Sequence, residues 1–590
     1  MKKLLDILTE QFAAVMTECG YDEKFARVTV SNRPDLCEYQ CNGAMALAKA
    51  HKKAPIMIAQ EIVAKLEGNE MFSEIVAVAP GFINMKISES FLASYVDEMA
   101  ASDKSGCDVN ENPKKVVIDY GGPNVAKPLH VGHLRSAIIG ETLKRLYRFK
   151  GDEVIGDVHL GDWGLQMGLI IEQLRIEQPD LVYFDESYEG EYPAEAPFTL
   201  SELEKIYPTA SARSKVDEEF KEKAHTSTLE LQKGKPGYTA LWKHILNVSI
   251  PDLKQNYKNL NVDFDLWKGE SDAKPYIPAM VDEMINSGLA HESQGAMVVD
   301  VTEETDAKEI PPCIIRKSDG AALYATSDLA TIVQRVQDFN PDEIIYLADK
   351  RQEMHFTQVF RTAKKAGIVD DSIKLTYEGF GTMNGKDNKP FKTRDGGVMR
   401  LETLIKDVED AVYAKIMENR EESEETARAT AKIVGLAAVK YGDLSNQTSK
   451  DYIFDTERFA SFEGNTGPYI LYTIVRIKSI LEKYVAANGA IENITTGVNQ
   501  SQTPSEKALM MELSKFNATI DSAYEELAPY KICAYIYDLS NAFNTFYHDN
   551  KIMAEEDKAK QAGFIKLLIV TKKTLEMAID ILGFTAPDRM

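Results

Sequence analysis

Two histidines, His130 and His133, lie three residues apart, with Gly132 between them. Residues 115–119 before them form a short apolar run typical of a buried parallel strand, and the residues after them have helical apolar spacing. A turn from a strand into a helix N-terminus favours anions, because free backbone N–H groups and the helix dipole point at the ligand. Imidazoles there can donate hydrogen bonds to phosphate oxygens as charge develops. The spacing alone also fits a metal pair or two surface histidines.

The surrounding elements predict a parallel sheet. The strand at 115–119 is followed by a helix from about His133, which Gly151 stops, and by a second strand at 153–158. This βαβ unit indicates a doubly wound, Rossmann-like core, and ligands of that sheet class bind at the first βα turn. A further strand appears at 343–347, so the polar, mostly helical residues from about 170 to 340 look like an insertion into the sheet domain.

The two ends of the chain have different patterns. Residues 1–105 indicate a small α+β domain, because alternating apolar residues at 74–78 and 82–87 flank a Pro-Gly turn. From about 401 to 590 the periodicity is helical almost throughout, which predicts a bundle. The predicted fold is therefore a multidomain α/β protein, with an α+β N-terminal domain at 1–105, a catalytic domain at 106–400 and an all-α C-terminal bundle at 401–590.

Composition sets limits on the class of protein. The chain has 590 residues, of which 44% are hydrophobic and 27% charged, and no apolar run approaches the roughly 20 residues of a membrane span. This predicts a cytoplasmic protein that does not bind membranes. The net charge of −24 opposes a broad nucleic-acid-binding surface, although a local basic groove can lie on an acidic body. Cys37 and Cys41 lack a second close pair, so we expect no structural metal.

Several segments together resemble a known family. The block Gly122–Ser136 resembles the HIGH-motif region of class I aminoacyl-tRNA synthetases, in the form seen in arginyl-tRNA synthetases. Gly161–Gly164 is similar to the GDWG element of that family, and Tyr324–Ala330 to its arginine-pocket segment. Two C-terminal segments, Thr466–Ile470 and Gly583–Met590, resemble its anticodon-binding domain, and Tyr39–Asn42 its N-terminal domain, which reaches the outer corner of the tRNA. Together the segments span nearly the whole chain in the family's order.

The resemblance implies that the protein activates arginine with ATP and Mg²⁺ and transfers it to the 3′ end of tRNA(Arg), with the 2′-hydroxyl attacking the adenylate. A guanidinium is a planar charged fork that paired carboxylate oxygens hold well, so Asp328, beside Tyr324, and Asp119 are candidates for its ligands. The other implied contacts are Asn124 and Gln352 to the amino and carboxylate end of arginine; Lys127, His130, Gly132, His133, Asp162, Lys392 and Arg394 to ATP; and Tyr39, Gln40, Asn42, Tyr547 and Met590 to tRNA.

The second catalytic loop departs from the usual class I pattern. Where most members carry Lys-Met-Ser-Lys-Ser, this chain has Thr393 in place of the second lysine. The resemblance implies that Lys127 supplies the missing positive charge. We expect Lys392 or Arg394 to reach the phosphates, the alternative being a solvated basic loop.

Two other functions fit part of the sequence. A small-molecule nucleotidyltransferase would explain the histidine turn but not the helical C-terminal half. A non-catalytic tRNA-binding relative would explain the altered loop at 389–396 but not the two histidines with Lys127. We expect a monomer that catalyses arginine–tRNA ligation.

Overall fold

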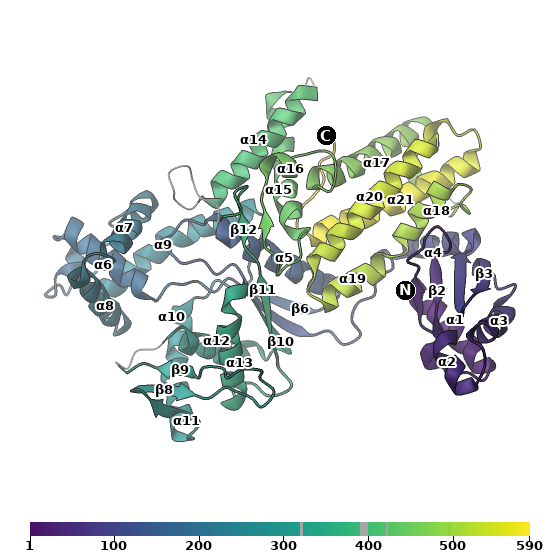
Figure 1. The fold of residues 1–590 in the computed structure, drawn as a ribbon. Helices are drawn as coiled ribbons and strands as arrows, with labels where there is room; N and C mark the ends of the chain where they lie inside the picture. The colour runs from purple at the N-terminus through teal and green to yellow at the C-terminus, as the bar shows by residue number, and fades with distance from the viewer. Residues whose placement is uncertain (319–322, 390–398, 420–422, 495) are drawn as a thin grey trace.

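A computed structural model describes residues 1–590 except 319–322, 390–398, 420–422 and 495 (Figure 1). Its centre is a four-stranded parallel sheet in the order β11-β10-β5-β6. The strands are β5 (Lys115–Asp119), β6 (Glu153–Asp157), β10 (Glu343–Asp349) and β11 (Lys374–Phe380). The predicted βαβ unit is confirmed, because α5 (Leu134–Phe149) connects β5 to its parallel neighbour β6.

Alternating side chains place a core on each face of this sheet. Ile118, Ile345 and Leu347 point to the face that packs against α5. Val117 and Ile344 point to the opposite face, which packs against α12 (Tyr324–Phe339) and α13 (Glu353–Lys365). Both faces are thus covered by helices, as a parallel sheet requires.

The insertion between β6 and β10 has two parts (Figure 1). The first is a group of four helices: α6 (Leu165–Glu177), α7 (Leu200–Arg213), α8 (Glu218–Gln232) and α9 (Pro236–Asn259). The second contains α10 (Glu270–Ala273), α11 (Ile277–Asn286) and an antiparallel sheet of β7 (His291–Ser293), β8 (Ala296–Val299) and β9 (Cys313–Arg316). The prediction of a mostly helical insertion missed this sheet, because strands this short show little periodicity.

The N-terminal part is an α+β unit, as predicted. Its sheet has the order β1-β2-β4-β3, and β3 and β4 form the expected antiparallel hairpin. Lys507 of the C-terminal bundle lies 2.7 Å from Glu38 and connects the two ends of the chain. The elements are α1 (Leu4–Glu18), β1 (Val28–Val30), β2 (Tyr39–Cys41), α2 (Gly43–His51), α3 (Pro55–Leu66), β3 (Phe72–Val78), β4 (Phe82–Ile87) and α4 (Glu89–Ala101).

The C-terminal part is a helical bundle, as predicted, with one short strand, β13 (Tyr452–Ile453), paired with β12 (Met383–Asn384). None of the helices in the described part of the chain has the length and apolar character that a membrane span needs. The bundle helices are α14 (Leu401–Asn419), α15 (Glu424–Leu444), α16 (Thr456–Phe459), α17 (Gly467–Asn488), α18 (Pro504–Leu513), α19 (Phe516–Glu525), α20 (Pro529–Asp549) and α21 (Lys558–Ile581).

Candidate functional site

The structure brings the two histidines together at the start of α5. Their rings lie 4.0 Å apart between centroids. Nδ1 of His130 accepts the backbone N–H of Gly132 at 3.0 Å, and Nδ1 of His133 accepts the backbone N–H of His130 at 3.2 Å. A Cβ atom on Gly132 would lie 2.8 Å from Cε1 of His130, so this turn requires glycine.

These bonds determine where each imidazole carries its proton. Because each Nδ1 is an acceptor, the proton of the neutral ring is on Nε2. Burial, with Lys127 nearby, lowers the pKa of His130, and burial followed by the charge of His130 lowers the pKa of His133 to about 3. Both rings are therefore neutral near pH 7, and each has one N–H with which to donate to an anion.

The loop before the histidines is held from outside the sheet. The backbone N–H of Ala126, a residue with a left-handed φ of 64°, donates to the hydroxyl of Ser249 on α9 at 3.0 Å. The ammonium of the next residue, Lys127, lies 4.4 Å from the ring centre of Tyr207 on α7. Asn124 bridges to Gly161, where a Cβ atom would lie 2.2 Å from the Asn124 side-chain oxygen. The helical insertion thus supports the loop that carries Lys127.

The predicted guanidinium ligand Asp328 lies on α12 beside His355 of α13. Its Oδ2 is 2.5 Å from Nε2 of His355. Tyr324 begins α12 and is 74% exposed. Gln352, which precedes α13, is also exposed. These three predicted arginine ligands therefore occupy the ends of α12 and α13 on the same side of the sheet.

Glu270 belongs to the same neighbourhood and is missing from the sequence-based prediction. It begins α10, accepts a hydrogen bond from the backbone of Trp163, and experiences the charges of His159, Asp162 and Asp328. Burial first, and then the charges of Asp162 and Asp328, raise the pKa of Glu270 to about 7, although His159 and the hydrogen bond from Trp163 act in the opposite direction. The sequence around Glu270 has no motif that would mark it as a site residue, because it follows a glycine at the start of a helix of only four residues.

Two other predicted carboxylates are already engaged within the protein. Oδ2 of Asp119 and Oδ2 of Asp157 lie 2.6 and 2.7 Å from the same nitrogen of Arg335, which is 1% exposed. Asp162 is 3% exposed and accepts the backbone N–H of Ser271 at 3.0 Å and its hydroxyl at 2.6 Å. Asp119 thus neutralises a buried arginine, and Asp162 anchors α10; that Asp119 binds arginine and Asp162 binds ATP stays a prediction.

The predicted loop residues Lys392 and Arg394 lie outside the described residues. The chain after that loop returns to the site. The backbone N–H of Val131 donates to Met399, and that of Leu401 donates to Leu129. Arg400 lies 2.8 Å from Glu204 of α7. Helix α7 therefore contacts both the histidine loop and the segment that follows the second catalytic loop.

The residues predicted to bind tRNA differ in accessibility. Tyr39 is 2% exposed and Met590 is buried, and their contacts with tRNA stay predictions. Gln40 bonds to Asn84 at 2.7 Å, while Asn42 is exposed. Tyr547 on α20 is 38% exposed.

An unpredicted arginine accompanies Tyr547. The guanidinium of Arg476 lies 5.3 Å from the ring of Tyr547 and 4.7 Å from that of Tyr472. Tyr472 and Arg476 come from α17 and Tyr547 from α20. We call this group of two aromatic rings and one guanidinium the α17–α20 surface.

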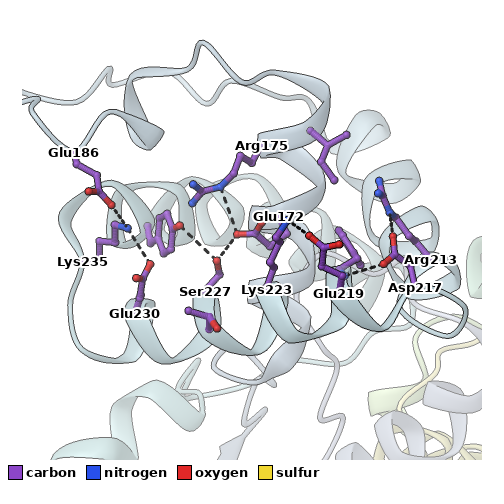
Figure 2. A pocket seen from close by; sticks show the side chains of 14 residues that line it. Glu172, Arg175, Glu186, Arg213, Asp217, Glu219, Lys223, Ser227, Glu230 and Lys235 are labelled. Atoms are coloured by element: carbon purple, nitrogen blue, oxygen red, sulfur yellow. Dashed lines mark hydrogen bonds and ion pairs between the residues drawn. The ribbon is translucent and has the colours of Figure 1, made fainter.

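A cavity of about 550 Å³ in the helical insertion contains none of these residues (Figure 2). Its charged side chains come from α6, α7, α8, the start of α9 and, with Glu186, the segment between α6 and α7, and they face one another. They form pairs, namely Arg213–Asp217 at 3.1 Å, Lys223–Glu219 at 2.8 Å and Lys235–Glu230 at 2.9 Å. Because these charges satisfy each other, we assign no ligand to this cavity.

Comparison with known proteins places every part of the chain in one family. A model described as tRNA synthetases class I (R), catalytic domain, matches residues 96–456; an arginyl tRNA synthetase N-terminal domain matches 4–87, and a DALR anticodon binding domain matches 470–590. Proteins named arginine–tRNA ligase from Agathobacter rectalis and Alkaliphilus oremlandii are 62% and 56% identical, with 100% and 99% of this chain and 100% of each relative covered. The arginyl-tRNA synthetase structures from Plasmodium falciparum and Thermus thermophilus match over 100% of both chains, with TM-scores of 0.81 and 0.76 at 24% and 22% identity, and share the fold.

Proposed function

The chain belongs to the arginyl-tRNA synthetase family, and from this we propose how its own residues perform the reaction. The enzyme is an arginine–tRNA ligase: it activates arginine with ATP to arginyl-adenylate and transfers the arginyl group to the 3′ end of tRNA(Arg). In the first step a carboxylate oxygen of arginine bonds to the α-phosphorus of ATP, and the bond to the leaving diphosphate breaks. In the second, a terminal ribose hydroxyl of the tRNA attacks the acyl carbon and AMP leaves.

The observation that carries the proposed mechanism is the pair of backbone bonds to Nδ1 of His130 and His133. These bonds leave Nε2–H of each neutral ring as a donor for the phosphate oxygens that gain charge during diphosphate release. Lys127 supplies a full positive charge beside them. The side chains form no covalent bond to the substrate, so positioning and electrostatic stabilisation account for the catalysis.

We assign the guanidinium of arginine to Asp328 and Glu270, with Tyr324 beside them. Asp328 lies close enough to Glu270 for its charge to raise the pKa of that carboxyl, and two acceptors suit a planar fork. Asn124 and Gln352 hold the amino and carboxylate end. Lysine in this pocket would leave buried acceptors unpaired, so the enzyme rejects it at the binding step.

We also propose how ATP and tRNA bind, from the residues whose side chains are accessible. ATP enters as its Mg²⁺ complex against the histidine loop, with Lys392 or Arg394 reaching the phosphates. Unpaired anticodon bases stack on the α17–α20 surface, and Gln40 and Asn42 contact the outer corner of the tRNA. We further propose a monomer in the cytoplasm, with functional parts at 1–105, 106–400 and 401–590.

Arginine-dependent exchange of diphosphate into ATP, measured with tRNA(Arg) present, tests the role of the histidines. Alanine at His130 or His133 is expected to lower the exchange rate about 100-fold or more, the scale of losing a donor to a developing oxyanion. His225, exposed on α8, is the matched control and should tolerate alanine. Wild-type exchange in both active-site variants would rule out this mechanism.

The proposed tRNA contact has its own test. Tyr547→Ala is expected to raise the KM for tRNA(Arg) in charging by about 10-fold or more, because one stacked base contributes roughly 1–3 kcal/mol. Tyr188, an exposed tyrosine of the insertion, is the control for replacing a surface ring. An unchanged KM in Tyr547→Ala would remove the α17–α20 surface from the tRNA site.

A further inference from the structure

His355 is a titratable side chain that none of the steps above uses. It lies in the first turn of α13, and its Nε2 is 2.5 Å from Oδ2 of Asp328 on α12. The His355 side chain is 30% exposed and that of Asp328 is 24% exposed, so the pair lies in the wall of the arginine site rather than on the open surface. The ring centroids of His355 and Phe356 lie 5.2 Å apart with the planes at 79°, a packing contact that restricts the imidazole.

We propose that His355 is a positioning residue for arginine recognition: its imidazole donates Nε2–H to Oδ2 of Asp328 and aims the other carboxylate oxygen at the guanidinium of the substrate. This inference rests on the proposed role of Asp328. His355 would contribute to specificity through Asp328, without itself touching arginine.

The physical reason is the freedom of an aspartate side chain. Rotation about its last bond would let the Asp328 carboxylate turn away from the guanidinium, and a hydrogen bond to a ring fixed by packing removes that freedom. With Oδ2 engaged by His355, Asp328 offers one oxygen to the substrate. The fork of the guanidinium then needs a second acceptor from another residue, which Glu270 can supply.

The test measures KM for arginine and kcat in diphosphate exchange at saturating ATP and tRNA(Arg). His355→Ala is expected to raise the KM for arginine about 10- to 100-fold, the loss of a hydrogen bond to a charged group, while kcat changes less than about threefold. His355→Gln keeps an N–H donor and is expected to restore most of the affinity.

Two further variants separate the possible outcomes. Asp328→Asn should raise the KM strongly, and adding His355→Ala to it should cause no further change, because the two residues act through one carboxylate. If Asp328→Asn leaves the KM unchanged, the proposed pocket itself is wrong. If it raises the KM but both His355 variants retain wild-type KM values for arginine, the positioning role alone is overturned. His291→Ala, at a more exposed histidine 3.8 Å from Asp300, is the control and should behave as wild type.

Discussion

Individual side chains in the site are held in defined protonation states by their surroundings. His133 has a pKa lowered to about 3, mainly by burial, so it stays neutral throughout the physiological range. A lowered histidine pKa means that its contribution to stability is complete above the unfolded value near 6.5 and is lost as the pH falls from there towards 3. Glu270 has the opposite shift, to about 7, and is charged only at higher pH.

For His133 we predict that adenylate formation in a single turnover, at saturating arginine and ATP, has a constant rate between pH 6 and 8. A neutral donor is available at every pH in this interval. A rate that declines with an apparent pKa between 6 and 7 in the wild-type enzyme, and not in His133→Gln, would show that the ring titrates and acts in another form.

For Glu270 we predict a pH-dependent effect of substitution. Glu270→Gln should raise the KM for arginine about 10-fold or more at pH 8, where the wild-type carboxylate is charged and bonds to the guanidinium. The ratio of variant to wild-type KM should shrink towards pH 6, since the wild-type carboxyl is then protonated. A ratio that is the same at both pH values would contradict a charged contact.

Among the elements, α7 of the insertion has the most direct link to the catalytic loops. Tyr207 lies under the ammonium of Lys127, and Glu204, one turn earlier, pairs with Arg400. Both contacts come from one face of a helix that begins about 70 residues after the histidines, with a Thr199–Glu202 capping box at its start. Helix α7 therefore fixes the position of the Lys127 side chain relative to the segment that follows the second catalytic loop.

Replacing Tyr207 tests whether that support matters for catalysis. Tyr207→Leu is expected to lower the rate of diphosphate exchange about 2- to 30-fold, because a cation–π contact contributes roughly 0.5–2 kcal/mol, whereas Tyr207→Phe keeps the ring face and should keep the rate. In a Lys127→Ala background, Tyr207→Leu should cause no further loss. An equal loss with and without Lys127 would mean that Tyr207 only stabilises the insertion.

At the scale of the whole molecule, Arg135 joins the catalytic sheet domain to the C-terminal bundle. It lies on α5, two residues after His133, and is 2% exposed. Its guanidinium lies 3.2 Å from Asp443 of α15 and donates to the carbonyl of Gly381 at 2.8 Å. Tyr452 donates to the same aspartate at 2.8 Å.

Removing this arginine would leave the fully buried Asp443 without its countercharge. Arg135→Met is expected to lower the free energy of the first unfolding transition in urea by about 3–5 kcal/mol, the range for breaking a buried ion pair. Arg148 is the matched control, because it lies on the same helix and pairs with Asp265 at 2.7 Å while remaining 44% exposed. Arg148→Met should lower the free energy of unfolding by about 1 kcal/mol or less. Equal decreases in the two variants would contradict a special role for the buried Arg135–Asp443 pair.

The sequence by itself determined those elements that can be predicted from residues close together in the chain. Strand β5, helix α5 and the hairpin of β3 and β4 follow from apolar spacing within a few residues, and the histidine turn follows from its place between a strand and a helix. The histidine turn could be located this way because both histidines lie within one local segment, whereas the role predicted for Lys127 came from the resemblance to the family.

The tertiary structure alone decided which polar and charged groups meet. Asp119 pairs with Arg335 across 216 residues, Asp162 with Ser271 across 109, and Asp328 with His355 across 27. Glu270 joins the pocket only because α10 packs against the GDWG segment. Spacing within a strand or helix indicates which face a side chain occupies. The partner that the side chain meets on that face depends on how distant elements pack. A carboxylate that binds substrate and one that neutralises a buried arginine therefore look alike in sequence.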